Sequence, residues 1–356
     1  MLVSLLLLAL GLVLMTGGAD FFVRGAALLA RVLGLSPLVI GLTIVAFGTS
    51  APEVGVSVSA ALAGESGMAV GNVIGSNSFN TLLILGVSAL IVPLSVQRQL
   101  VRLDVPIMIV VTALVWGMAA SGAISRVESS ILLLLLVAWI VLTVRTGRAD
   151  AEEAEEILER PFTPLRDVPA LVLGLGALVL GAKLSVDGAL GVARGLGVSE
   201  VIIGITLVAA GTSLPELVTS VVAAMRGQRD IAVGNIVGSN LFNLLCVLGV
   251  SGVVGDGLVV EPGLVTRDFP VVFITAMVCL PFFITGEEIC RSEGLLLVAG
   301  YVLYMTEVVL EQLYPAWQDP MRAGILYAFL PTVALVTLLN VFVHLRNRRR
   351  KGSGIP

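Results

Sequence analysis

The sequence contains one stretch twice, and this repeat limits the possible folds more than any other feature. Residues 45–80 read VAFGTSAPEVGVSVSAALAGESGMAVGNVIGSNSFN, and residues 208–243 read VAAGTSLPELVTSVVAAMRGQRDIAVGNIVGSNLFN. At an offset of 163, about 21 of these 36 positions are identical. The identical pairs include the polar residues that would be costly in lipid. Agreement at polar positions points to a site that both copies share.

The composition places this repeat in a membrane. The chain is 57% hydrophobic and 13% charged, with a mean hydropathy of +1.04, whereas soluble domains are roughly 25% charged. Most of the chain falls into apolar runs of about 20 residues, which is long enough for a helix to cross a hydrocarbon core of about 30 Å. The runs lack the alternation of a β-barrel, so each backbone must satisfy its hydrogen bonds within a helix. We expect eleven spans, at 3–31, 38–63, 69–93, 103–121, 127–145, 168–195, 200–225, 231–254, 268–285, 292–313 and 323–345.

Two other interpretations of the apolar and cysteine patterns fail. The first run has no basic segment before it and continues past any plausible cleavage site, so we expect a transmembrane helix and not a signal peptide. Cys246, Cys279 and Cys290 lie in or near apolar runs without CxxC spacing. They indicate neither a disulfide framework nor a metal site.

A polar segment divides the chain into two halves. Five spans lie on each side of it, and an odd number means that the second half enters the membrane the opposite way up. The predicted fold is therefore an all-α integral membrane protein with two inverted-topology repeats of five transmembrane helices plus an extra C-terminal one. We expect these boundaries: first repeat 1–145, acidic cytoplasmic linker 146–167, second repeat 168–313, extra helix with its preceding loop 314–345, and basic cytoplasmic tail 346–356.

Lysine and arginine counts predict the orientation. With the N-terminus outside, the cytoplasmic segments carry fifteen of these residues and the outer segments four. Cytoplasmic loops of membrane proteins are enriched in Lys and Arg. We therefore expect the N-terminus outside and the C-terminus in the cytoplasm.

The GTSxPE segments carry the first candidate ligands. Thr49, Ser50 and Glu53 share one helix face, and Pro52 removes a backbone donor and crowds a carbonyl, so the helix should bend there. Thr212, Ser213, Pro215 and Glu216 repeat this arrangement. Inversion brings the two bent helices together near the midplane, where broken helices form ion sites.

The next helix of each half adds a polar stripe. Asn72, Ser76 and Asn80 are spaced by four, as are Asn235, Ser239 and Asn243. The glycine pairs Gly71–Gly75 and Gly234–Gly238 should let these helices pack closely on the bent ones.

The two glutamates carry the functional prediction. An unpaired carboxylate inside a membrane costs several kcal/mol, and these runs hold no Lys or Arg at matching depth. We therefore expect a cation bound by oxygen atoms alone. Without Cys or His nearby, the ligands suit calcium, sodium or protons better than soft metals. These ions are substrates, and no resident cofactor is expected.

Two further polar patterns predict local structure. Asp20 with Arg24, and Lys183 with Asp187, are spaced i, i+4 and should form ion pairs on a helix face. Asp104 and Asp268 each precede a proline by two residues, which is typical of a helix N-cap.

At these residues the sequence resembles the cation/calcium antiporter superfamily, and most closely its prokaryotic sodium/calcium exchanger branch. The two GTSxPE and GNxxGSN motifs carry the resemblance, which covers residues 1–313. It implies a ten-helix core in a prokaryotic plasma membrane, with cation sites between helices two, three, seven and eight. It also implies alternating access by sliding of helices one and six. The implied ligands are Thr49, Ser50, Glu53, Ser76, Asn80 and the Ala46 carbonyl, with Thr212, Ser213, Glu216, Ser239 and the Ala209 carbonyl from the second half.

Two departures from the family pattern matter. Many exchangers in the family have an aspartate where this chain has Asn243, so this chain's metal-binding set holds two carboxylates and not three. Two monovalent ions per calcium would balance that charge, which predicts electroneutral exchange. The eleventh run lies outside the ten-helix pattern, and both anchoring and a dimer contact fit it.

Three functions compete for this site. An antiporter that exchanges Ca²⁺ for Na⁺ leads, with the lipid bilayer as its environment and no nucleic-acid partner. Proton-coupled Ca²⁺ exchange uses the same ligands, because burial favours a protonated carboxyl. A passive cation channel is a third function, although fast conduction requires weaker binding at several sites. An intramembrane enzyme is not expected, because the spans show no nucleophile with a base and no HExxH motif.

Overall fold

The structure, a computed structural model, describes residues 1–147, 163–198, 203, 209–284 and 288–339. These residues form an all-α membrane protein of two repeats, as predicted. The helical elements of the first half are α1 (Leu2–Leu33), α2 (Pro37–Ile40), η1 (Gly41–Val45), α3 (Ala46–Thr49), α4 (Ala51–Leu62), α5 (Ser66–Ser78), η2 (Phe79–Ile84), α6 (Leu85–Ile91), η3 (Leu100–Asp104), α7 (Val105–Ala119) and α8 (Arg126–Gly147).

The second half repeats this order. Its described helical elements are α9 (Pro164–Gly195), α11 (Ala209–Gly211), α12 (Leu214–Met225), α13 (Arg229–Phe242), η6 (Asn243–Val247), α14 (Leu248–Val254), η7 (Leu264–Asp268), α15 (Phe269–Ile284) and α16 (Arg291–Leu313). They are followed by η8 (Pro315–Trp317), α17 (Gln318–Gly324) and η9 (Ile325–Phe329).

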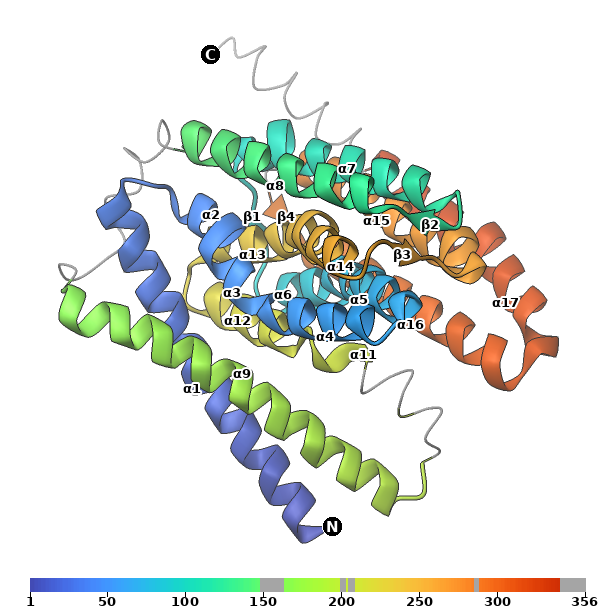
Figure 1. Cartoon of the computed structure of the whole chain (residues 1–356), viewed down its shortest axis with the longest axis horizontal. Helices are drawn as coiled ribbons and strands as arrows, with labels where there is room; N and C mark the ends of the chain where they lie inside the picture. Colours follow the sequence, from blue (N-terminus) through green and yellow to red (C-terminus); the bar gives the residue numbers. More distant parts are fainter. Residues whose placement is uncertain (148–162, 199–202, 204–208, 285–287, 340–356) are drawn as a thin grey trace, which may run out of the picture.

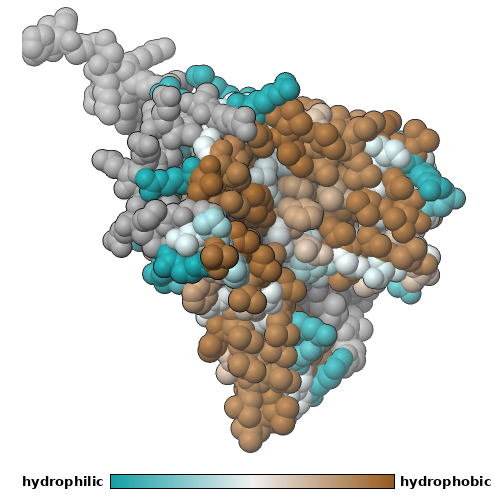
Figure 2. Space-filling view, turned by 60° about the vertical axis from the view of Figure 1, so that its left-hand side comes forward, coloured by the Kyte–Doolittle hydropathy of each residue, from teal (hydrophilic) through white to brown (hydrophobic). Residues whose placement is uncertain are grey.

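The helices have the lengths that membrane spans require. Among the described residues, nine helices are long and apolar enough to cross, and the bent pair Pro37–Thr49 with Ala51–Leu62 makes a tenth span. The span predicted at 200–225 lies partly outside the described residues, which include its second part as α12. Most of the acidic linker and the basic tail lie outside them too. Apolar side chains cover most of the face shown in Figure 2, as a surface in contact with lipid requires.

The helices that carry the GNxxGSN motifs lie at the centre. Their spans, Ser66–Ile91 and Arg229–Val254, are the most buried, at 72% and 83% of their most apolar segments. The Gly, Ser and Asn residues of these two spans have small side chains, so other helices can approach the spans on all sides. A Cβ atom at Gly234 would lie 2.8 Å from the Leu38 carbonyl oxygen, and Gly238 contacts Leu42 and Ala46. The predicted close packing on the bent helix is thus confirmed for this pair. It is not seen for Gly71 and Gly75 among the described residues, where a Cβ atom at Gly71 would lie 4.0 Å from Leu264 and one at Gly75 would meet nothing within 4 Å.

Two short sheets join the halves at opposite faces. Strand β1 (Leu94–Ser95) pairs with β4 (Glu288–Ile289), and β2 (Ala123–Ile124) pairs with β3 (Leu258–Val259), both antiparallel. The first sheet adjoins the α12–α13 turn, where Arg229 lies 3.7 Å from Glu288. The second adjoins the α4–α5 turn, where the Val259 amide donates to Ser66 Oγ. We name the two faces of the molecule after these turns.

Helices α1 and α9 cross the other helices obliquely and lie against each other (Figure 1). Their backbones touch through glycines that recur every seven residues in both halves. A Cβ atom at Gly18 would lie 2.6 Å from the Leu178 nitrogen, and one at Gly174 would lie 2.7 Å from the Phe22 nitrogen. Any side chain here would force the helices apart, so α1 and α9 form one packed pair. The seam consists of Gly11, Gly18, Gly25, Gly174, Gly181 and Gly188.

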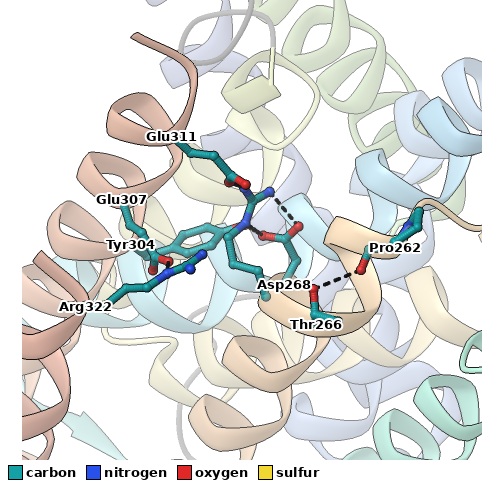
Figure 3. A network of polar contacts seen from close by, with 8 residues as sticks. Pro262, Thr266, Asp268, Tyr304, Glu307, Glu311 and Arg322 are labelled. Atoms are coloured by element: carbon teal, nitrogen blue, oxygen red, sulfur yellow. Dashed lines mark hydrogen bonds and ion pairs between the residues drawn. The ribbon is translucent and has the colours of Figure 1, made fainter. Parts of the chain in front are cut away.

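The eleventh span packs beside α16. Arg322 of α17 donates from Nε to Glu307 of α16 at 2.7 Å, next to a second cluster in which Arg267 pairs with Asp268 and Glu311 (Figure 3). Only 6% of the most apolar part of this span is buried. Besides this ion pair, the buried Val333 and the partly buried Phe329 pack on the core, and most of the remaining surface of the span is exposed.

The N-cap prediction for Asp104 and Asp268 is wrong. Each residue is the last of a wide helical turn that continues into the next helix, so Asp104 has helical dihedrals (φ −73°, ψ −41°) and its side chain caps no backbone N–H. Its buried carboxylate instead accepts hydrogen bonds from Trp139, Thr143 and Gln99 at 3.1–3.2 Å. Asp268 accepts from the Tyr304 hydroxyl at 2.8 Å. Both aspartates connect neighbouring helices.

The predicted ion pairs within α1 and α9 differ in outcome. Arg24 and Asp20 pair at 3.1 Å, as predicted. Lys183 and Asp187 make no ion pair in the part of the chain that the structure describes, so that prediction is wrong. Both side chains are exposed, and an exposed pair of this spacing gains only a few tenths of a kcal/mol.

Candidate cation site

The helix breaks lie where the prolines predict them. The two parts of the second span meet at Ser50 (φ −80°, ψ 4°) with a bend of 46°. Because Pro52 has no N–H, the carbonyl of Gly48 loses its helical donor there. Ser213 has nearly the same dihedrals (φ −91°, ψ 7°) and precedes Pro215. Each break therefore leaves hydroxyl and backbone oxygen atoms beside a glutamate.

Each glutamate is met by a hydroxyl from the other half. Glu53 and Glu216 are fully buried. Ser213 Oγ donates to Glu53 Oε1 at 3.0 Å and lies 2.9 Å from Ser76 Oγ. Ser50 Oγ donates to Glu216 Oε1 at 3.2 Å. The two GTSxPE segments therefore form one constellation and not two separate ones.

The threonines make a second set of contacts between the halves. Thr49 Oγ1 lies 3.0 Å from Asn235 Oδ1 and 3.5 Å from Ser239 Oγ. Thr212 Oγ1 lies 3.3 Å from Asn72 Oδ1. Residues of four helical segments from both halves thus surround the glutamates.

Asn80 and Asn243 occupy equivalent wide turns. Asn80 lies in η2 and Asn243 opens η6, both of which are π-helical, a local geometry that is frequent at functional sites. Asn243 Nδ2 donates to Asn77 Oδ1 at 3.0 Å, which leaves its own Oδ1 free.

Buried oxygen atoms without partners mark the constellation. In the described residues, Oε2 of Glu53 and of Glu216 and Oδ1 of Asn80 and of Asn243 are buried and accept no hydrogen bond. Among the described residues, neither glutamate has an ion-pair partner. The same residues contain no cluster of three His, Cys, Asp or Glu side chains that could hold a metal ion. Leaving such groups unpaired is costly. The arrangement fits a cation held by two carboxylates and neutral oxygens.

The structure places most predicted ligands in direct contact. Side-chain contacts join seven of them in three groups: Glu53 with Ser76 and Ser213, Ser50 with Glu216, and Thr49 with Ser239. Thr212 contacts Asn72, which lies beside the Glu53 carbonyl, whereas Asn243 contacts only Asn77 and Asn80 is buried without a partner. The Ala46 carbonyl lies 3.2 Å from Thr49 Oγ1, and Ala209 begins α11 at the equivalent place.

The predicted ligand set omitted four residues that support it. These are Asn72 and Asn235, which contact Ser57 and Ser220 respectively. All four are identical between the halves at the offset of 163. This identity was the available signal, since Ser57 and Ser220 each lie one turn after a glutamate on the same helix.

A cavity of about 800 Å³ leads to one side of the constellation. It opens between α4 and α9 toward the α4–α5 face, and its lining includes Pro52, Ser59, Thr212 and Pro215. Lys183 and Asp187 line its outer part. Thr212 is accordingly half-buried, whereas its counterpart Thr49 is fully buried.

Inverted repeats with broken helices that meet at a buried polar site define a membrane transport protein. The family model for the sodium/calcium exchanger protein matches residues 3–145 and 168–310, which correspond to the two halves. The chain belongs to this family and is a multi-pass cation/calcium antiporter.

Individual relatives agree along nearly their whole length. A putative antiporter, CaxA, from Alkalimonas amylolytica is 39% identical over 85% of this chain and 98% of its own. The sodium/calcium exchanger MaX1 of Methanosarcina acetivorans is 35% identical over 85% and 97%. The solved structure of the sodium-calcium exchanger NCX_Mj has a TM-score of 0.75, with 32% identity over 86% of this chain and 98% of that one. These relatives are transporters and not enzymes.

Proposed function

We propose that the chain exchanges Ca²⁺ for Na⁺ by alternating access, with both ions using one site between the two GTSxPE breaks. The observation that carries this proposal is the set of buried, partner-free oxygens on Glu53, Glu216, Asn80 and Asn243. The proposed ligands are these residues with Thr49, Ser50, Ser76, Thr212, Ser213, Ser239 and the carbonyls of Ala46 and Ala209. Hard cations prefer such oxygen donors.

The charge of the site explains why it exchanges ions instead of leaking them. Two carboxylates in a low dielectric are costly when unbalanced, so the unloaded site resists the change of access. One Ca²⁺ or two Na⁺ balance the charge and permit it. Because Asn243 is neutral, we propose a ratio of two Na⁺ to one Ca²⁺ and electroneutral exchange.

The proposal includes an orientation in the membrane, which rests on the distribution of basic residues. The bias of fifteen basic residues to four favours an outer N-terminus, which places the α4–α5 face outside and the α12–α13 face in the cytoplasm. Residues 1–145 and 168–313 are the two functional repeats, in a plasma membrane.

Calcium-45 uptake into proteoliposomes tests the coupling ion. Vesicles loaded with sodium, with choline or with an acidic buffer are diluted into labelled Ca²⁺ at low sodium. We expect uptake only with internal sodium. Uptake driven by the pH step alone would establish proton coupling, and uptake indifferent to both gradients would establish a channel.

A further inference from the structure

We propose that Asn72 and Asn235 are positioning residues for the cation. Each accepts the hydroxyl proton of the threonine of the opposite half, and so keeps that threonine's oxygen and a neighbouring backbone carbonyl available to the ion. This inference rests on the proposed function and extends it to residues that do not touch the substrate.

The amide orientation of each asparagine is fixed by its own half. Asn235 Nδ2 donates to Ser220 Oγ at 2.9 Å and lies 3.4 Å from the Glu216 carbonyl oxygen. Asn72 Nδ2 has the equivalent partners, Ser57 Oγ at 3.0 Å and the Glu53 carbonyl at 3.5 Å. Since an amide nitrogen is a donor only, these contacts direct it toward the bent helix of the same half. Each Oδ1 is left to accept from the other half.

Thr49 has one proton and faces Ser239 Oγ at 3.5 Å and the Glu216 carboxylate, with three nearer acceptors within 3.2 Å. They are Asn235 Oδ1 at 3.0 Å, the Val45 carbonyl at 3.1 Å and the Ala46 carbonyl at 3.2 Å. A helical threonine without another partner bonds back to its own helix. Such a bond would occupy a lone pair of a carbonyl oxygen, and Ala46 provides one of the proposed ligands. In the proposed arrangement Asn235, the nearest of these acceptors, takes the proton and leaves the carbonyls to the ion.

The same arrangement recurs in the second half, at a looser distance. Thr212 Oγ1 lies 3.3 Å from Asn72 Oδ1, and both side chains are half-buried, whereas Asn235 and Thr49 are fully buried. The Asn235–Thr49 contact is therefore shielded from solvent, whereas the Asn72–Thr212 contact borders the cavity. Each asparagine links the glutamate helix of its own half to the threonine of the other, so a relative shift of the halves would alter both ligand sets.

Double-mutant cycles test this assignment. The single changes are Asn235→Leu, Asn72→Leu, Thr49→Val and Thr212→Val. The measurements are the half-saturating Ca²⁺ concentration and maximal rate of exchange in sodium-loaded proteoliposomes, with Ca²⁺ binding by calorimetry in detergent. We expect Asn235→Leu to raise the half-saturating concentration about tenfold, the size of one lost hydrogen bond to an ion ligand. The maximal rate should change less.

Non-additivity separates positioning from a general structural role. In the Thr49→Val background, Asn235→Leu should add less than twofold, whereas in the Thr212→Val background it should retain its full effect. The pair Asn72 and Thr212 should behave in the mirrored way. Thr112→Val is the matched control, because the Thr112 hydroxyl is buried but bonds back to Met108 at 2.7 Å on its own helix. It should leave the half-saturating concentration unchanged.

Asn235→Asp covers the case in which the leucine variant does not fold. It keeps an oxygen acceptor, so Thr49→Val should still raise the half-saturating concentration in that background. Additive effects within the Asn235–Thr49 cycle, or equal coupling of Asn235 to both threonines, would overturn the assignment. If wild-type uptake did not require sodium, the proposed exchange would fail, yet the calorimetric cycle would still decide the role of the asparagines.

Discussion

The two halves are near copies at the centre of the molecule and differ at its two faces. On the α12–α13 face, Arg226 at the end of α12 donates to Asp20 of α1 at 2.7 Å, and Arg24 pairs with the same carboxylate. On the α4–α5 face, Ala63 stands at the position equivalent to Arg226, and Lys183 and Asp187 of α9 face the cavity. The pair of α1 and α9 is therefore tied to the core on one face and separated from it on the other.

In the proposed exchange, this difference separates the residues that serve binding from those that serve access. Under that proposal both halves provide equivalent ligands, which accounts for the duplicated central residues. For the proposed exchange the two faces must also not be open together. The ion pair at Asp20 lies on the α12–α13 face, where Thr49 and Asn235 are fully buried, and we call this the closed face. In an inverted repeat, the same fold can exchange these roles when α1 and α9 move.

The largest expected effect is at the symmetric centre. Glu53→Gln and Glu216→Gln should each reduce exchange to background, because one remaining carboxylate cannot balance a divalent ion. Calcium-45 uptake in sodium-loaded vesicles measures this. Glu261→Gln, at an exposed glutamate, is the control and should retain wild-type uptake. Substantial exchange by either central variant would break the equivalence of the halves.

Adding a third carboxylate should change the charge that is moved. Asn243→Asp should make the initial exchange rate depend severalfold on an imposed membrane potential, because a third monovalent ion is then needed for balance. Asn80→Asp, at the equivalent position, should act in the same way. A strong response to potential in the wild type would contradict the electroneutral ratio.

Breaking the ion pair should open the closed face by a smaller amount. The assay uses a background without Cys246, Cys279 and Cys290, with one cysteine at Ser59→Cys or at the equivalent Val222→Cys. A membrane-impermeant thiol reagent should label the first readily and the second slowly. Arg226→Gln should raise labelling at position 222 a fewfold, since an ion pair of this exposure contributes about 1 kcal/mol or less. Unchanged labelling at both positions would show that the ion pair does not hold this face closed.

Building the missing ion pair should have the smallest effect. Ala63→Arg places a cation in the cavity that Asp187 also lines, so it should slow labelling at Ser59→Cys by about twofold. Ala63→Gln has a similar polar length without the charge and serves as the control. Equal slowing by both variants would mean that the side chain blocks the reagent by size alone.

Periodicity and composition predict the spans, the bend at Pro52 and the grouping of polar residues from both halves. These features depend on local rules and on the inversion, which the sequence repeat reveals directly. The role of Asp104 was not predictable in this way, because Trp139 lies in another span and the wide turn at Leu100–Asp104 has no local signal. The ion pair predicted for Lys183 and Asp187 failed for a similar reason. The i, i+4 spacing is the same as that of Asp20 and Arg24, and it does not reveal that Arg226 from another helix also binds Asp20.

The contacts of Asn72 and Asn235 show the same limit. Their spacing from Ser76 and Ser239 predicts a polar stripe, but the partners Thr212 and Thr49 lie in the opposite half. Only the relative placement of the halves reveals from which threonine hydroxyl each asparagine accepts a hydrogen bond.

If both halves build one shared site, each chain binds one calcium ion, and a count of the bound ions distinguishes this from two separate sites. Isothermal titration of the purified protein in sodium-free detergent solution gives this number. We expect one Ca²⁺ per chain, with binding lost in Glu53→Gln and in Glu216→Gln alike. Two ions per chain, with one retained in each variant, would show two independent sites and contradict the shared site.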